Sequence, residues 1–252
     1  MNFDLHTHTT YSDGRVPIED LIMHGEALEL DAMAITDHLF PEKGAFLDEM
    51  VAKVQEGRKR VHYLLLAGVE GTILDVDGSV SVDEASRAKI DICLVDVSDF
   101  TKGIYKDPPA TPAKQVENFV TAMLNMCQNP VVDVVAHPFN MGRTKPPLML
   151  ESISLRDYRR VARAFADHKK YFEVMNNMWW WFPNVPPRHF KERYLDVIRV
   201  FRDEGVRFSI GSDSHSVGWT GNIAWSQRML REAGVGEGQM IRPNEFLKRN
   251  AK

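Results

Sequence analysis

The chain has 252 residues, of which 44% are hydrophobic, so it is long enough to bury one large core. Its formal net charge of −4 argues against nucleic-acid binding through a broadly basic surface. No apolar run approaches the roughly 18 residues of a membrane helix, and the N-terminus lacks a signal-peptide pattern, so no membrane association is expected. The net charge does not exclude an anionic substrate, because bound cations would make a cleft positive.

The two cysteines, Cys93 and Cys127, have no metal-type spacing and lie within apolar runs. This pattern predicts buried free thiols in a reducing compartment, and the protein is expected to be cytoplasmic.

Short apolar runs alternate with amphipathic segments along the chain. The predicted strands cover residues 2–5, 32–36, 63–69, 91–97, 131–136, 171–175 and 207–210. Helices are expected after Pro17, from Pro112, over 155–166 and over 188–204, with Gly205 as the C-cap of the last. This alternation is typical of repeated βα units with a parallel sheet, in one domain spanning 1–252.

Two histidines one residue apart, His6 and His8, end the first predicted strand. Side chains at positions i and i+2 of a strand point to the same face, so both imidazoles can reach one metal ion. A similar pair, Asp213 and His215, follows the last predicted strand. The two pairs can meet only if the fold brings those strand ends together.

The other predicted strands also end in polar residues. In a parallel barrel these ends share one rim, where such folds build active sites. The residues are His38 after the second strand, Glu70 at the end of the third, Ser98 and Asp99 after the fourth, His137 after the fifth, and Glu173 and Asn176 around the end of the sixth. His24, His62, His168 and His189 lie elsewhere and are expected to be ordinary surface or structural histidines.

Five segments together resemble the motifs of the PHP (polymerase and histidinol phosphatase) domain family. They are residues 6–14 (HTHTTYSDG), 36–38 (TDH), 68–70 (GVE), 136–138 (AHP) and 211–215 (GSDSH). The resemblance implies a distorted seven-stranded (β/α) barrel of the α/β class, with two or three divalent metal ions and phosphoesterase activity. It implies one ion on His6, His8, Glu70 and Asp213, a second on Glu70 and His137, and a third on Asp13, His38 and His215.

Imidazole and carboxylate ligands without thiolates suit zinc, manganese or iron, and they do not single one out. A carboxylate such as Glu70 can bridge two cations. Taken alone, Asp13 before Gly14 could equally organise a turn. Asp37 is expected to orient an imidazole rather than bind the ion itself, and Glu173 is expected to be structural or to support a ligand.

The sequence departs from the family pattern after the fourth predicted strand, where the family commonly has a histidine. The chain has Ser98 at that position, so Asp99 or water would have to replace the missing ligand. Either two or three ions are therefore compatible with the sequence.

Two loops are candidates for substrate contact. Arg143 could clamp a phosphate with its planar guanidinium, although a solvated surface arginine is nearly as well supported; Lys102 is a weaker candidate of the same kind. The aromatic run Trp179-Trp180-Trp181 could stack on a planar substrate group, or it could cap the barrel mouth or bury against a partner subunit.

The leading functional hypothesis is hydrolysis of a small phosphate ester, histidinol-phosphate-like or nucleotide-like, by a metal-activated water. A proofreading-type 3′–5′ nuclease and a metal-binding module without turnover are the alternatives. Nucleic acid is the less favoured partner, because no basic groove can be recognised in the sequence.

Overall fold

The computed structural model describes residues 2–41 and 44–247. Seven parallel strands form a single sheet whose order follows the chain. The strands are β1 (Phe3–Asp4), β2 (Ala32–Ile35), β3 (Leu64–Thr72), β4 (Ile92–Asp96), β5 (Val134–Val135), β6 (Tyr171–Met175) and β7 (Arg207–Gly211).

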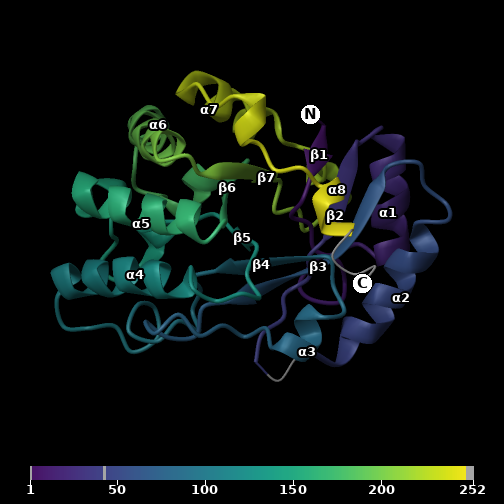
Figure 1. Cartoon of the computed structure of the whole chain (residues 1–252), viewed down its shortest axis with the longest axis horizontal. Helices are drawn as coiled ribbons and strands as arrows, with labels where there is room; N and C mark the ends of the chain where they lie inside the picture. The colour runs from purple at the N-terminus through teal and green to yellow at the C-terminus, as the bar shows by residue number, and fades with distance from the viewer. Residues whose placement is uncertain (1, 42–43, 248–252) are drawn as a thin grey trace.

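The sheet curls until its first and last strands meet (Figure 1). The Leu5 N–H donates to the Ile210 carbonyl at 3.3 Å, and the His8 N–H donates to the Ser214 carbonyl at 2.8 Å. A parallel bridge between Thr7 and Ser214 continues this pairing past the strand ends. The fold is therefore a nearly closed α/β barrel, as the sequence predicts.

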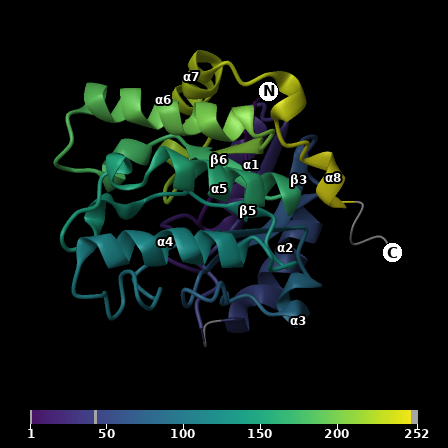
Figure 2. The same cartoon turned by 60° about the vertical axis from the view of Figure 1, so that its left-hand side comes forward.

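Helices cover the outside of the barrel. They are α1 (Ile18–Ala27), α2 (Leu47–Gly57), α3 (Glu84–Arg87), α4 (Pro112–Met126), α5 (Leu155–Asp167), α6 (Pro187–Asp203), α7 (Ala224–Ala233) and α8 (Asn244–Leu247). Figures 1 and 2 show α4, α5 and α6 layered side by side, with α1 and α2 on the opposite side of the barrel. None of the helices in residues 2–41 and 44–247 is both long and apolar enough to cross a membrane.

All seven predicted strands are present, with differences in length. The first and fifth have only two residues, whereas β3 runs on to Thr72. The predicted helices are present too, and Gly205 adopts a φ of +81° directly after the last turn of α6, which is the left-handed conformation that favours glycine. The helices α2, α3, α7 and α8 were not predicted.

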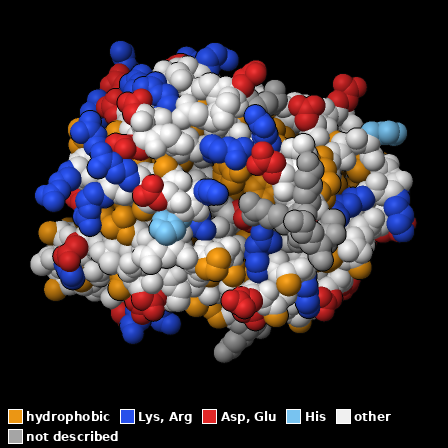
Figure 3. All heavy atoms as spheres, viewed as in Figure 1, with side chains coloured by type: hydrophobic (Ala, Val, Ile, Leu, Met, Phe, Trp, Pro, Cys, Tyr) orange, Lys and Arg blue, Asp and Glu red, His pale blue; other side chains and the backbone are white. Residues whose placement is uncertain are grey.

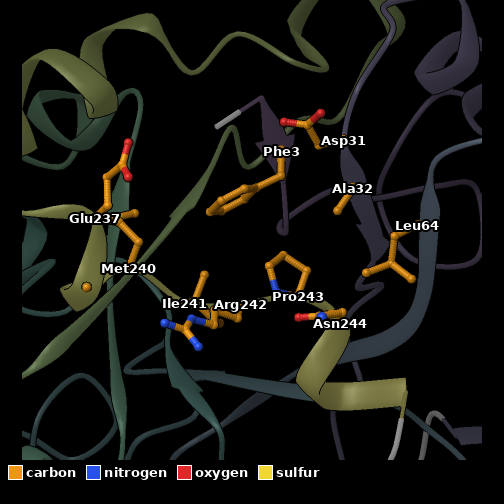
Figure 4. Close-up of a pocket in the computed structure, with 11 residues that line it drawn as sticks. Phe3, Asp31, Ala32, Leu64, Glu237, Met240, Ile241, Arg242, Pro243 and Asn244 are labelled. Atoms are coloured by element: carbon orange, nitrogen blue, oxygen red, sulfur yellow. The ribbon is translucent and has the colours of Figure 1, made fainter.

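The strands are buried on both faces, as in other parallel sheets covered by helices. Every residue of β4 is buried, and both cysteines are buried free thiols, as expected. A cavity of about 750 Å³ lies at the amino ends of β1, β2 and β3 (Figure 4). Its walls come from Phe3, Ala32 and Leu64 and from residues 237–244. This cavity lies at the other end of the strands from the histidine cluster described below.

Candidate metal centre

The two histidines that follow β1 point into the barrel, where both are buried. Nε2 of His6 lies 3.2 Å from Oε2 of Glu70, and Nε2 of His8 lies 3.5 Å from the same oxygen. Glu70 is part of β3 and is itself buried. The same-face geometry that the spacing predicts therefore brings both imidazoles to one carboxylate.

The other oxygen of Glu70 faces a second group of residues. Nε2 of His137 lies 3.1 Å from Oε1 of Glu70. Asp96, at the end of β4, completes a cluster in which one ligand atom of each residue lies within 4.8 Å of the others. Glu70 is thus shared between two groups of potential ligands.

Asp96 corrects the expectation for the end of the fourth strand. Asp99 is exposed and belongs to none of the ligand clusters, and the Ser98 hydroxyl lies 2.6 Å from that of Thr72. Asp96 is only 5% exposed and faces Glu70 and His137. The physical reason is that Asp96 is the last residue of β4 and is held inside the barrel by the sheet, whereas Ser98 and Asp99 lie beyond the strand in the following loop.

A third group lies at the outer edge of the cluster. Oδ1 of Asp13 is 3.1 Å from Nε2 of His215 and 3.6 Å from Nε2 of His38. His8 joins these three residues in one cluster. Asp213 lies between the groups, with Oδ1 3.2 Å from Nε2 of His8. All eight predicted ligands therefore lie in one connected cluster, with Asp96 added to it.

Asp37 supports the cluster differently from what was expected. Within the described residues no hydrogen bond or ion pair joins it to an imidazole; its carboxylate accepts hydrogen bonds from the backbone and the hydroxyl of both Thr9 and Ser12. These bonds hold the loop that carries Asp13. Gly14 is needed there because a Cβ at this position would lie 2.5 Å from the backbone oxygen of His8.

Glu173 on β6 orients two of the histidines. Its Oε1 lies 2.9 Å from Nδ1 of His6, and its Oε2 accepts a hydrogen bond from the His137 N–H at 2.8 Å. A supporting role was predicted for this residue, and the structure places it in that role. Asp4, whose role was not predicted, accepts hydrogen bonds from the Ser212 N–H and hydroxyl and from the Gly221 N–H, fixing the loop after β7.

The chemistry of the cluster fits divalent cations. Five buried atoms in it have no hydrogen-bond partner among residues 2–41 and 44–247: Nε2 of His6, Nε2 of His8, both carboxylate oxygens of Glu70 and Oδ1 of Asp96. A buried polar atom without a partner destabilises the fold, and these atoms belong to the groups of residues that could hold a metal ion. Nitrogen and carboxylate donors without thiolates suit zinc, manganese or iron.

The charges within the cluster shift several pKa values. Burial would lower the pKa of His38, but the carboxylates of Glu70 and Asp13 outweigh it and raise the pKa to about 9. Burial raises the pKa of Asp96 to about 7, and the negative charge of Glu70 adds to this shift. Burial would also raise the pKa of Glu70, yet the adjacent His6 and His38 hold it well below its ordinary range.

Two of the candidate ligands have a strained backbone. His137 has a φ of +30° and Asp213 a φ of +54°, in the region that residues other than glycine rarely adopt. Such outliers cluster at functional sites, where the surrounding structure holds them in place.

Arg143 lies beside the aromatic loop. Its guanidinium carbon is 3.3 Å from the centre of the Trp180 ring, and its Nε and Nη2 donate to the Trp180 carbonyl. Among the described residues, no hydrogen bond or ion pair joins Arg143 to the histidine cluster. Phosphate binding by Arg143 therefore stays a prediction, and the contacts in the structure are those of a residue that positions Trp180.

The three adjacent tryptophans have different environments. The Trp181 ring lies 5.1 Å from the His137 ring, and the Trp179 ring packs edge-on against Trp225 at the same distance. Trp180 is half exposed and lines a cavity of about 530 Å³. The cavity is also lined by Asp13, Asp213 and His215 of the cluster and by Arg15, Met175, Asn177, Ser216 and Trp219.

Comparisons with known proteins agree with this geometry. Residues 4–177 match the model of the PHP domain. A probable phosphatase of Acetivibrio thermocellus is 28% identical over 236 residues, covering 91% of this chain and 86% of the relative. A probable phosphatase of Aeromonas hydrophila is 25% identical, covering 92% and 85%.

The fold also matches a crystal structure of histidinol phosphate phosphatase from Lactococcus lactis, which contains zinc, L-histidinol and phosphate. The TM-score is 0.64 at 16% identity, and the alignment covers 93% of this chain and 94% of the other. At that identity the likeness establishes the barrel fold alone. The family match covers more than half of the chain, and the protein therefore belongs to the PHP domain family.

Proposed function

We propose that this PHP-family protein hydrolyses the phosphoester bond of a small phosphorylated molecule at the histidine and carboxylate cluster. The observation that carries the proposal is Glu70, whose two buried oxygens have no hydrogen bond within the part of the chain that the structure describes and face separate sets of potential ligands. Such a carboxylate suits a pair of adjacent cations, which is the arrangement used for in-line displacement at phosphorus.

We assign the residues to three positions. His6, His8, Glu70 and Asp213 would hold one divalent ion, and Glu70, Asp96 and His137 would hold a second. Asp13, His38 and His215, next to His8, would hold a third. Zinc, manganese and iron all suit these donors. With Asp96 included, the second position has three protein ligands, as many as a catalytic site commonly uses.

Bound cations at these positions would supply a nucleophilic hydroxide at neutral pH and neutralise the phosphate oxygens. The chain itself provides orientation. A carboxylate only accepts hydrogen bonds, so Glu173 keeps the proton of His6 on Nδ1 and leaves the lone pair of Nε2 directed into the cluster. Asp37 holds the loop of Asp13, and Asp4 holds the loop of Asp213.

A small substrate fits better than a polynucleotide. On the face shown in Figure 3, basic side chains gather over α5 and α6, but acidic side chains are interspersed among them. Several of these arginines are paired, as in the contacts of Arg163 with Glu204 and of Arg160 with Asp157. The cavity beside the cluster has the size of a small-molecule site.

The test is turnover of a phosphoester panel by protein reconstituted with manganese, zinc or iron. The panel contains phosphomonoesters, phosphodiesters and short oligonucleotides. We expect cleavage of at least one small ester that is lost in Glu70→Gln and His8→Ala and retained in His189→Ala, which changes an exposed histidine outside the cluster.

The alternatives give different results in the same assay. Cleavage of oligonucleotides without cleavage of small esters would replace the proposal by a nuclease. Stoichiometric metal with no turnover of any ester would replace it by a metal-binding module without catalysis.

A further inference from the structure

His38 differs from the other histidines of the cluster in what holds its ring. In each of the others, Nδ1 lies within 3.5 Å of a group that is not assigned to a metal ion. These groups are the Glu173 carboxylate for His6, the Ser12 hydroxyl for His8, the Asn140 amide for His137 and the Asp213 carbonyl for His215. Within the described residues, the ring nitrogens of His38 have no such partner. They face two carboxylates of the cluster, with Nδ1 3.0 Å from Oε2 of Glu70 and Nε2 3.6 Å from Oδ1 of Asp13.

Those two carboxylates cannot fix the ring of His38 once cations are bound. In the proposed site Glu70 bridges two ions and Asp13 binds a third, so their oxygens are occupied by metal rather than by an N–H donor. Rotation of an imidazole about its Cβ–Cγ bond has only a broad intrinsic preference. The orientation of His38 must therefore come from a different contact.

Phe40 supplies that contact. Its ring centre lies 4.6 Å from that of His38, and the two planes are only 19° apart, which is the geometry of an offset stack. On its other contact, the Phe40 ring lies 4.8 Å from the ring of Phe100, which is 41% exposed and comes from the loop after β4. The three rings form a stack, His38–Phe40–Phe100, that leads from the metal cluster to the surface.

The backbone beside this stack is held without help from the Phe40 ring. The Leu39 N–H donates to the Glu70 carbonyl at 2.8 Å, and the Leu39 carbonyl accepts the Ser81 hydroxyl at 2.6 Å. A parallel bridge also joins His38 to Glu70. Because these bonds fix the main chain at residues 38 and 39, the Phe40 ring acts on the side chain of His38.

We infer that Phe40 is a positioning residue for the metal position assigned to Asp13, His38 and His215. Its ring holds the imidazole of His38 in the orientation that ligation needs, and Phe100 supports it from the solvent side. A metal-bound imidazole is electron-poor, so its contact with the face of a phenylalanine becomes more favourable when the ion is present. The inference rests on the proposed function for the presence of ions at the cluster and adds a residue that supports one of them.

The test measures metal binding by equilibrium dialysis against manganese, followed by elemental analysis. His38→Ala identifies the ion that His38 helps to hold. Phe40→Leu keeps an apolar side chain but removes the flat ring, and it should weaken that same ion roughly three- to tenfold, the range that one aromatic stack provides. Phe40→Tyr retains the ring and should bind as the unchanged protein does.

Two further comparisons separate positioning from a general effect on the fold. Trp179→Leu removes an exposed ring of the rim that packs on Trp225, and it should leave metal binding unchanged. In the His38→Ala background, Phe40→Leu should cause no further loss, because the ring that Phe40 positions is absent.

An equal loss from Phe40→Leu in both backgrounds would show that Phe40 supports the loop as a whole and would overturn the inference. Unaltered metal binding in Phe40→Leu, or in His38→Ala, would overturn it as well. All of these measurements are independent of turnover. A protein that gives the expected metal binding but cleaves no ester would refute the proposed function and leave this inference standing.

Discussion

Glu173 connects two histidines that come from different strand ends. One carboxylate oxygen lies 2.9 Å from Nδ1 of His6, and the other accepts the backbone N–H of His137 at 2.8 Å. Both groups are donors, so the position requires an acceptor at each end.

Glu173→Gln should therefore lower metal affinity by about 10- to 100-fold, the usual effect of losing a residue that orients a metal ligand. An amide offers one oxygen and one NH₂ group, so it can accept from only one of the two donors. Calorimetric titration of metal-free protein with manganese or zinc measures the change. Glu192→Gln, which changes an exposed carboxylate on α6, is the control and should bind as the unchanged protein does.

Asp96 and Asp99 offer a matched pair of substitutions. Asp96→Asn should reduce the number of bound ions by one, because it removes the charged ligand from the position that Glu70 and His137 share. Asp99→Asn, three residues away and exposed, should leave the number unchanged. Elemental analysis after gel filtration gives the count, and equal metal content in the two variants would contradict the assignment of Asp96.

Metal affinity should rise with pH between about 6 and 9. In the metal-free protein the pKa of Asp96 is about 7 and that of His38 about 9. Both groups carry a proton below these values, and a metal ion must displace it. As the pH rises through 7 and then 9, Asp96 and then His38 lose their protons, so protons no longer compete with the metal ion for these groups. Calorimetry in buffers of different ionisation enthalpy counts the released protons, and pH-independent affinity with no proton release would refute the prediction.

Gly211 at the end of β7 leaves room for the side chains of His6 and Glu173. A Cβ at this position would collide with Oε1 of Glu173 and with Cβ of His6, both of which are buried. Gly211→Ala should lower the free energy of unfolding by about 1–3 kcal/mol, as overpacking in a core usually does. Gly238→Ala adds a Cβ with nothing within 4 Å and should have little effect. Urea denaturation of both variants makes the comparison.

Much of the barrel could be predicted because its evidence is local. Each strand is an apolar run, and each predicted ligand except Asp13, which lies further along the first loop, stands at or just after the end of such a run. Parallel strands place those ends on one rim whatever the details of packing, so the meeting of His6 and His8 with Asp213 and His215 follows from topology. The helices α2, α3, α7 and α8 were missed, and the extents of β1, β3 and β5 differ from the predicted ones.

The role that we propose for Asp96 at a second metal position could not be predicted from the order of residues along the chain. Ser98 stands where the family has a histidine, and Asp99 is the adjacent acid. Which acid lies close to Glu70 and His137 depends on how the sheet curls and how the next loop packs, and the sequence does not show this. Asp96 did carry a sequence signal, since it is a charged residue between Val95 and Val97 within the fourth predicted strand. A carboxylate buried in a strand destabilises the fold unless it is hydrogen-bonded, paired with a cation or bound to a metal ion.

By itself the sequence determined the barrel and the ring of candidate ligands at the strand ends, because both depend on periodicity and on the order of motifs along the chain. The tertiary structure decided which acid faces Glu70, which carboxylate orients His6, and which tryptophans line the cavity with Arg15. These relationships join residues from different strands and loops, and their distances depend on how the sheet curls and on how the loops pack. No local pattern in the sequence encodes those distances.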